Sequence, residues 1–149
     1  MAFFEVFGAA GVAALEDVCR AIPAEIPIVV DAKRGDIGNT ANAYAQAAFA
    51  LGDIVTVSPY MGTDSVAPFL KDDSKGVFAL CKTSNPGSND LQTLELASGG
   101  PLYLAVASLA QSWGPNVGLV VGATDVAVLI SRCENRNFMI FQKGMYLIS

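Results

Sequence analysis

The sequence predicts an α/β fold of parallel strands, in the form of an incomplete (β/α)8 barrel. Short β-branched runs alternate along the chain with amphipathic helical patterns, and no Asn-Gly hairpin signal interrupts them. This alternation is typical of parallel strands joined by right-handed crossovers, in either a closed barrel or an open doubly wound sheet. A doubly wound sheet usually has a Gly-rich phosphate fingerprint after its first strand, and this sequence has none there. Polar motifs instead follow several successive strands, as a barrel would place them.

Each expected strand is a short apolar run. The segment 3–7 is aromatic and is consistent with the end of a buried strand. Four clear runs and one weak run follow it, at 26–30, 54–57, 76–81, 117–121 and 138–141. The spacing of apolar residues predicts helices between these strands, at 10–22, 40–51, 63–70, 91–96, 101–113 and 125–133.

Composition narrows the class of protein. With 149 residues, of which 52% are hydrophobic, the chain can form one domain with a sizeable core and is not a disordered chain. The net charge of −5, without a basic run, argues against nucleic acid as a partner. The sequence has no histidine, which excludes histidine-based triads, histidine metal sites and histidine acid–base catalysis.

Cysteine usage and hydropathy indicate the compartment. The three cysteines are widely spaced and form no Cys-x-x-Cys pair, which is typical of a reduced, intracellular protein. The uncharged stretch 96–124 is interrupted by glycine and proline at 99–101 and 114–115. No unbroken piece of it reaches the roughly 18 residues that a membrane-spanning helix needs. We therefore expect a soluble, cytoplasmic protein without a membrane partner.

The most informative stretch is 31–37, Asp-Ala-Lys-Arg-Gly-Asp-Ile, which directly follows the apolar run at 26–30. Asp31 and Lys33 are two residues apart, so an extended backbone points both side chains to the same side. The carboxyl end of a parallel strand is where α/β folds bind ligands. From the residues alone, the charges fit either a catalytic cluster or a solvated loop with an incidental ion pair.

The order of the residues in this stretch resembles the pattern of a known protein family. The pattern Asp-x-Lys-x-x-Asp-Ile at 31–37 resembles the signature of the orotidine 5'-monophosphate decarboxylase family. Three later stretches are similar to that family in matching order, at 56–62, 81–88 and 121–124. The resemblance covers roughly residues 2–132. It implies a (β/α)8 barrel that converts orotidine 5'-phosphate to uridine 5'-phosphate and CO2 in pyrimidine biosynthesis, with no cofactor and no metal.

The resemblance also assigns roles. Loss of CO2 leaves a carbanion, which needs a fixed cation and a proton. Lys33 would be the proton donor, and Asp31 would lie beside the substrate carboxylate and hold Lys33. Asp36 would reach into the active site of a neighbouring subunit, accompanied by Ile37 and Thr40 as substrate-binding residues. The resemblance therefore implies a homodimer with shared sites.

Residues outside the charged stretch have weaker assignments. The family places a base-recognising serine at Ser84, although a turn-forming serine with a local backbone bond is the alternative. We expect the head group of Lys82 to be solvated and Arg34 to be a surface or interface charge. Two strand-end turns, one with Thr56, Ser58 and Pro59 and one at 122–124, would shape the pocket or simply form tight connections.

The chain also departs from the family pattern. The family's first active-site lysine would precede Met1, and its phosphate-binding Gln and Arg would follow residue 132. The tail at 133–149 does not resemble the family, so we divide the chain into a partial barrel at 1–132 and an atypical tail. A complete barrel takes about 250 residues. We therefore expect a fragment that folds poorly and is inactive on its own.

Two alternatives remain open. A 3-keto sugar-phosphate decarboxylase of the same superfamily, which uses Mg²⁺, shares the Asp-x-Lys-x-x-Asp pattern, although the loop at 83–87 disfavours it. The second alternative is a non-catalytic fragment that pairs with other subunits through the dimer interface around Asp36, Ile37 and Thr40.

Overall fold

The computed structural model describes residues 1–122 and a short strand at 140–141. Its five strands form one parallel sheet in the order β1-β2-β3-β4-β5. The strands are β1 (Val29–Arg34), β2 (Ile54–Val57), β3 (Gly76–Lys82), β4 (Val117–Val121) and β5 (Ile140–Phe141). Each strand therefore pairs with the next one along the chain. A barrel has this sequential order, whereas the order in a doubly wound sheet reverses at a switch point.

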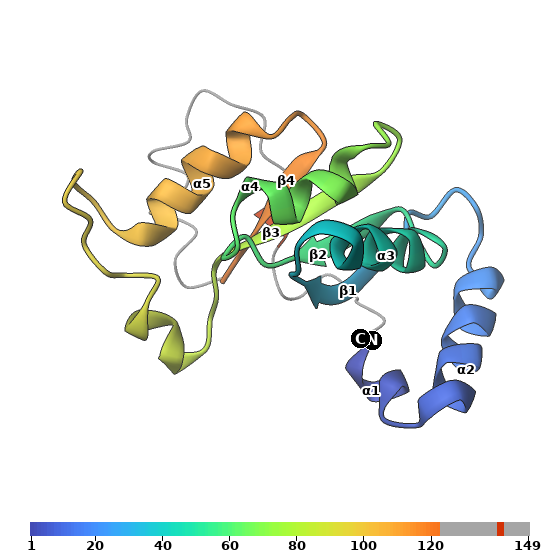
Figure 1. Cartoon of the computed structure of the whole chain (residues 1–149). Helices are drawn as coiled ribbons and strands as arrows, with labels where there is room; N and C mark the ends of the chain where they lie inside the picture. Colours follow the sequence, from blue (N-terminus) through green and yellow to red (C-terminus); the bar gives the residue numbers. More distant parts are fainter. Residues whose placement is uncertain (123–139, 142–149) are drawn as a thin grey trace.

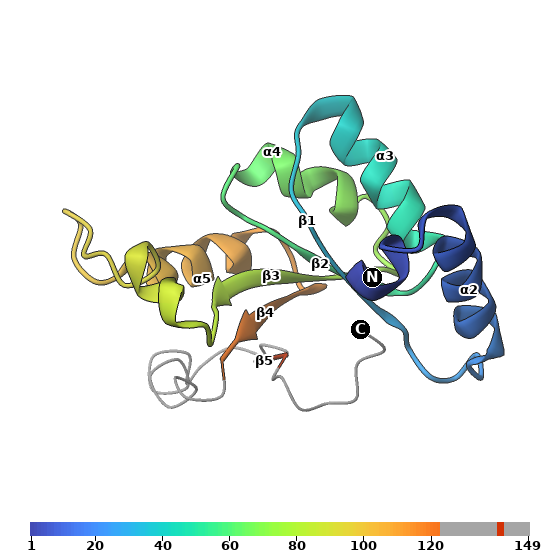
Figure 2. The ribbon, with the colours of Figure 1, turned by 90° about the horizontal axis from the view of Figure 1, so that it is seen from below.

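Helices occupy most connections between the strands. They are α1 (Ala2–Glu5), α2 (Gly8–Ala21), α3 (Gly38–Phe49), α4 (Thr63–Val66) and α5 (Leu102–Ser112), with 3₁₀ turns η1 (Ala67–Leu70) and η2 (Pro86–Asp90). Helices α3, α4 and α5 lie along one face of the sheet, while α1 and α2 form an arm beside β1 (Figures 1 and 2). The strands and most helices thus confirm the expected alternation.

The core lies between the sheet and these three helices. Alternate residues of a strand face the same side, so Val55 and Val57 point to the helices together and are almost fully buried. The small residues Ala41, Ala45 and Ala48 let α3 approach the sheet closely. The rings of Phe49 and Phe69 meet edge to face, with their centroids 6.3 Å apart. Because the strands are parallel, their carboxyl ends lie together at one edge of this packed sheet.

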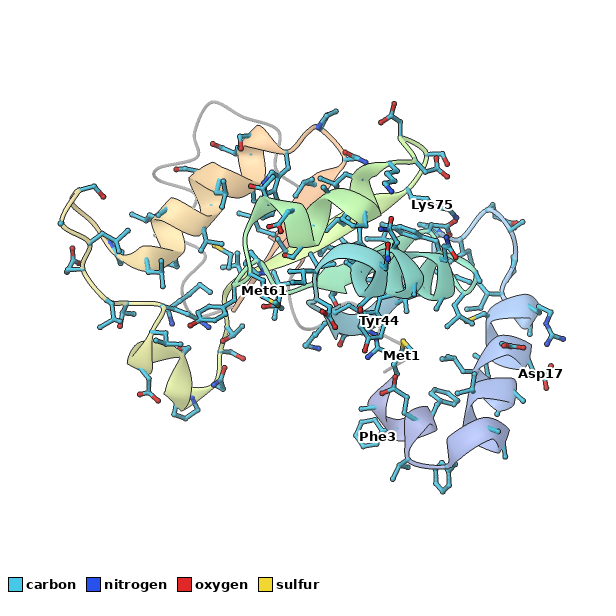
Figure 3. The ribbon with its side chains drawn as sticks, in the orientation of Figure 1. Met1, Phe3, Asp17, Tyr44, Met61 and Lys75 are labelled. Carbon is cyan, nitrogen blue, oxygen red and sulfur yellow. The ribbon has the colours of Figure 1, made fainter. Side chains whose placement is uncertain are left out.

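The segment 3–7 is not a strand, contrary to expectation. It includes most of α1, and the side chain of Phe3 points away from the rest of the molecule (Figure 3) and is 73% exposed. A strand satisfies its backbone only by pairing with a sheet. Here the N–H groups of Phe4 and Val6 instead bond to the nearby carbonyls of Met1 and Ala2.

The segment 91–96 is also not helical. Glu95 forms an isolated antiparallel bridge with Pro101, and the N–H of Leu102 donates to the carbonyl of Leu94. The chain can reverse between them because Gly99 and Gly100 adopt φ values of 92° and 81°, which favour glycine. These hydrogen bonds join the two sides of the loop and replace the intrahelical hydrogen bonds that the apolar spacing predicts. The expected helix at 125–133 lies outside the described residues.

The described part of the chain lacks two features that would bear on function. None of its helices has both the length and the apolar character needed to cross a membrane. Residues 1–122 also contain no group of three or more His, Cys, Asp or Glu side chains placed to hold a metal ion.

Candidate active site

The ion pair between Lys33 and Asp31 lies near the carboxyl end of β1. The ammonium Nζ of Lys33 donates to Oδ1 of Asp31 at 2.6 Å. The side chain of Asp31 is only 16% exposed, whereas that of Lys33 is 53% exposed. The structure thus brings the two residues together as their spacing predicts. The carboxylate is fixed against the sheet, and the lysine head remains accessible to a ligand.

Thr56 of β2 links both residues to the sheet. Thr56 is buried, with 1% of the residue exposed. Its hydroxyl donates to Oδ1 of Asp31 at 2.9 Å. The same hydroxyl accepts the backbone N–H of Lys33 at 2.9 Å. Lys33 has a φ of 48°, in the left-handed region that residues with a Cβ seldom adopt. The strand is therefore irregular at the residue that carries the ammonium group.

The electrostatics keep Asp31 ionised. Burial of the carboxyl group acts to raise its pKa. The hydrogen bonds from Lys33 and Thr56 and the charge of Lys33 outweigh burial, so the pKa of Asp31 lies below its ordinary value. At neutral pH the pair is consequently a carboxylate beside an ammonium group.

Asp36 takes a different position. Its Oδ1 accepts the backbone N–H of Ile37 at 2.8 Å. No ion pair joins Asp36 to Lys33 within residues 1–122. Ile37, which is 51% exposed, and Thr40 lie at the start of α3 and face solvent. The structure therefore brings Asp31 and Lys33 together but keeps Asp36, Ile37 and Thr40 outside that pair.

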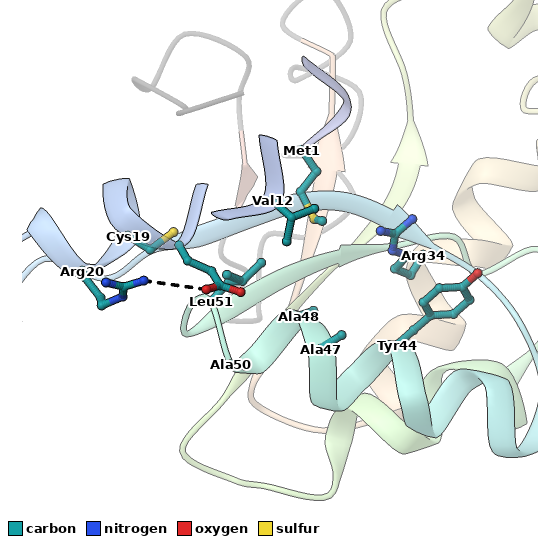
Figure 4. A pocket seen from close by; sticks show the side chains of 11 residues that line it. Met1, Val12, Cys19, Arg20, Arg34, Tyr44, Ala47, Ala48, Ala50 and Leu51 are labelled. Carbon is teal, nitrogen blue, oxygen red and sulfur yellow. Dashed lines mark ion pairs between the residues drawn. The ribbon is translucent and has the colours of Figure 1, made fainter. Parts of the chain in front are cut away.

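Arg34 is engaged within the chain. It forms an ion pair with Glu5 at 2.7 Å, and its guanidinium carbon lies 4.9 Å from the centroid of the Tyr44 ring. The side chains of Arg34 and Tyr44 line a cavity of about 540 Å³ between α2 and α3 (Figure 4). Arg34 therefore ties the N-terminal arm to the sheet, a role that its position in the motif does not reveal.

Ser84 lies in the loop after β3 and is exposed. This loop lines a second cavity, of about 380 Å³, together with Lys82 and Tyr103. The end of β4 packs closely against it, because a Cβ on Gly122 would lie 3.1 Å from the backbone and Cβ of Ser84. The loop is braced from the other side by Gln92, whose Oε1 accepts the N–H of Thr83 at 2.8 Å. A serine hydroxyl is thus presented at the same sheet edge as Lys33.

Lys82 differs from expectation, because its head group is not solvated. The residue is 6% exposed, and its Nζ donates to Oγ of Ser88 at 2.8 Å. The buried cation therefore joins the end of β3 to η2, beneath the loop that carries Ser84. Sequence reasoning missed Lys82, Gln92 and the bridging role of Thr56. The one available signal was that Thr56 and Lys82 lie at or next to strand ends, within the motif stretches at 56–62 and 81–88. Gln92 lies beyond these stretches and had no such signal.

The comparisons with known proteins decide the family. The model of the orotidine 5'-phosphate decarboxylase / HUMPS family matches residues 1–147. This chain belongs to that family. A relative from Roseiflexus sp. strain RS-1, named orotidine 5'-phosphate decarboxylase, is 60% identical over 129 residues, which are 83% of this chain and 47% of the relative. A relative of the same name from Halorubrum lacusprofundi is 56% identical over 126 residues, 83% of this chain and 45% of the relative.

Solved structures agree with the family assignment. The OMP decarboxylase of Leishmania donovani superposes with a TM-score of 0.89 at 53% identity, over 97% of this chain and 60% of that one. The UMP synthase of the same organism superposes with a TM-score of 0.88 at 53% identity, over 97% of this chain and 34% of that one. The fold is therefore part of a (β/α)8 barrel, as the sequence predicts. This chain spans about half the length of the orotidine 5'-phosphate decarboxylase relatives that it matches.

Proposed function

We propose that the protein acts in the decarboxylation of orotidine 5'-phosphate to uridine 5'-phosphate and CO2, the carboxy-lyase step of pyrimidine biosynthesis. The observation that carries the proposal is the ammonium group of Lys33, held 2.6 Å from a largely buried carboxylate at the carboxyl end of β1. Family membership supports it, because relatives at up to 60% identity bear this name. A cytoplasmic location would suit such a reaction.

Lys33 is the proposed acid. When the bond between the ring and the carboxylate breaks, its electron pair stays on the ring carbon and CO2 leaves. The ammonium group stabilises that developing negative charge and then donates a proton to the same carbon. Because a single proton replaces the CO2 that leaves, the reaction needs no oxidant. We propose that Lys33 takes the place of a cofactor by stabilising the carbanion. The 53% exposure of the Lys33 side chain leaves room for a substrate against it.

Asp31 is proposed to orient Lys33 and to act on the substrate directly. Its carboxylate is ionised and fixed by two hydrogen bonds on Oδ1. A second carboxylate beside it, that of the substrate, would be repelled in the ground state. As CO2 forms, the negative charge moves from the substrate carboxylate to the ring, and its repulsion by Asp31 is relieved. The proximity of Asp31 to the substrate carboxylate therefore favours the transition state over the bound substrate.

Ser84 is proposed to recognise the pyrimidine base. A hydroxyl group can both donate to and accept from the amide edge of the ring. The proposal is supported by the exposure of Ser84 and by the 380 Å³ cavity that its loop lines. The bracing by Gln92 and the close packing of Gly122 would limit movement of this hydroxyl.

Asp36, Ile37 and Thr40 are proposed to complete the site of a second subunit. They lie near Lys33 in sequence, yet Asp36 forms no ion pair with it within residues 1–122. Ile37 is half-exposed at the start of α3, where an apolar side chain is free to pack against another copy. The proposed assembly is accordingly a homodimer whose sites are shared.

The decisive test is a chimera in which this chain replaces the matching part of the Roseiflexus relative, with the unaltered relative as positive control. We expect the chimera to decarboxylate orotidine 5'-phosphate, measured as CO2 release. Failure of a folded chimera to do so would contradict the proposal. Activity on a 3-keto sugar phosphate that requires added Mg²⁺ would also contradict it and support the alternative decarboxylase.

A further inference from the structure

We infer that Thr56 is the positioning residue that fixes both the carboxylate of Asp31 and the backbone geometry of Lys33. The inference rests on the proposed function for its catalytic meaning but on contacts within the chain for its geometry. The key observation is that one buried hydroxyl bonds to both members of the ion pair, across two neighbouring strands.

The strand register shows why a side chain is needed there. Val30 pairs with Val55 and Arg34 pairs with Val57, so three residues of β1, from Asp31 to Lys33, face the single residue Thr56 of β2. Such a bulge leaves backbone groups without a ladder partner. The hydroxyl of Thr56 supplies the missing acceptor for the N–H of Lys33 at 2.9 Å.

The chemistry of the hydroxyl suits this position in particular. A carboxylate oxygen needs a donor and a backbone N–H needs an acceptor, and a hydroxyl is both at once. Thr56 is 1% exposed, so water competes little for either bond. Valine would have nearly the same shape and could make neither bond, whereas serine could make both.

The bulge has a consequence for Lys33. Its φ of 48° is the one positive φ of a non-glycine residue among the described residues 1–122. Such a conformation persists only where the surroundings hold it, and it is often found at functional sites. The Thr56 hydroxyl bonds to the N–H of this very residue. Removing the hydroxyl should therefore free the lysine backbone as well as the carboxylate.

The test compares Thr56→Val with Thr56→Ser in the 149-residue chain. The pKa of Asp31 is measured by NMR titration of its side-chain carboxyl carbon. The charged groups that act on this carboxyl are the ammonium of Lys33 and, more weakly, the α-amino group of Met1, and both variants retain them. We expect Thr56→Val to raise the pKa of Asp31 toward its ordinary value and Thr56→Ser to leave it low. Thr63→Val, which removes a hydroxyl that accepts from the Trp113 indole, is the matched control.

The same variants in the chimera connect geometry to catalysis. We expect Thr56→Val to lower kcat by tenfold or more with little change in KM, and Thr56→Ser to restore it. An unchanged pKa of Asp31 in Thr56→Val, or an equal rise in Thr56→Ser, would overturn the inference. If Thr56→Val does not fold in the isolated chain, the titration is performed in the chimera, where the relative supplies the rest of the barrel. A chimera without decarboxylase activity would contradict the proposed function, while the titration would still decide the role of Thr56.

Discussion

Lys33 combines three properties that make it the centre of the candidate site: a paired ammonium group, a half-exposed side chain and a left-handed backbone. Its pairing with Asp31 follows from the two-residue spacing and could be predicted. Its backbone conformation could not, because it depends on a bulge that exists only once β1 and β2 have paired. The role of Thr56 was hidden for the same reason, since it is defined by its position opposite that bulge.

Replacing the proposed acid should abolish most of the activity. In the chimera, Lys33→Ala removes both the charge at the carbanion and the proton, so we expect kcat to fall about 10³-fold or more, on the order of 4 kcal/mol in the barrier. Lys71→Ala is the control, because Lys71 is an exposed lysine that bonds to Asn42 on α3. Turnover of Lys33→Ala close to that of the control would refute the assignment.

Ser84 allows a test that separates recognition from folding. Ser84→Ala in the chimera should raise KM for orotidine 5'-phosphate about fivefold, because a hydrogen bond to the base contributes on the order of 1 kcal/mol. The melting temperature should stay within a degree or two of that of Ser98→Ala, a change at another exposed loop serine. If the variant is destabilised while KM is unaltered, Ser84 serves the turn and not the substrate.

Burial of Lys82 shows where residue-level prediction fails. Lysine is almost never buried, so a solvated head group was the reasonable expectation. The structure buries it because η2 folds back over the end of β3 and supplies the Ser88 hydroxyl as a partner. That partner is six residues away in a loop whose path the sequence does not specify.

At the scale of elements, prediction worked where local pattern and tertiary environment agree. The runs at 54–57, 76–81 and 117–121 became strands β2, β3 and β4, with shifts of at most one residue. These runs are buried on a parallel sheet, which favours continuous apolar sequence. The segments 3–7 and 91–96 are apolar too, but their environments are an exposed arm and a loop. Apolar content alone cannot distinguish these environments.

Asp53 ties the amino ends of three strands together. Its Oδ2 accepts the N–H of Ile28, just before β1, at 3.0 Å, and its Oδ1 pairs with Lys75, just before β3, at 3.2 Å. The hydrogen bond from Ile28 is the main cause that lowers the pKa of Asp53. Burial opposes it, and Lys75 lowers the pKa further. The carboxylate is 48% exposed, so solvent screening limits its contribution.

Replacing Asp53 should destabilise the sheet in a pH-dependent way. We expect Asp53→Ala to lower the free energy of unfolding by about 1 kcal/mol at pH 7. Because the pKa of Asp53 is lower in the folded state, its contribution is present above the unfolded pKa of about 3.9 and is lost as the pH falls through the folded value. Urea denaturation at pH 7 and pH 3 measures this, with the exposed Asp73→Ala as control. A difference from the control that is as large at pH 3 as at pH 7 would contradict the account.

At the scale of the whole molecule, the sequence predicted a barrel rather than a doubly wound sheet, and the sequential strand order agrees. The motifs predicted this because they recur at the ends of several successive strands, which is how a barrel arranges its site residues. The division at residue 132 and the expectation that the chain folds poorly on its own stay predictions. They depend on contacts between elements that the local sequence pattern does not describe.

The proposed dimer makes a prediction about the whole molecule in solution. Ile37 is the residue before α3, is 51% exposed and makes no side-chain cap to that helix. If Ile37 packs against a second copy, an acidic residue in its place should weaken the dimer. It should do so without unfolding the subunit, because aspartate is a preferred N-cap residue. Burial of an isoleucine contributes about 1.5–3 kcal/mol, so we expect Ile37→Asp to raise the dimer dissociation constant at least about tenfold.

Sedimentation equilibrium on the chimera measures that constant, and circular dichroism reports the fold of the same samples. Leu94→Asp is the matched control, because Leu94 is also 51% exposed but lies in the loop before α5. If the active sites are shared between subunits, the decarboxylase activity of Ile37→Asp should fall as the dimeric fraction falls. The activity should return at high protein concentration, where the dimer re-forms. A dimer that is equally stable in both variants would place the interface elsewhere. Full activity of a dissociated Ile37→Asp subunit would show that Asp36 and Thr40 do not act across subunits.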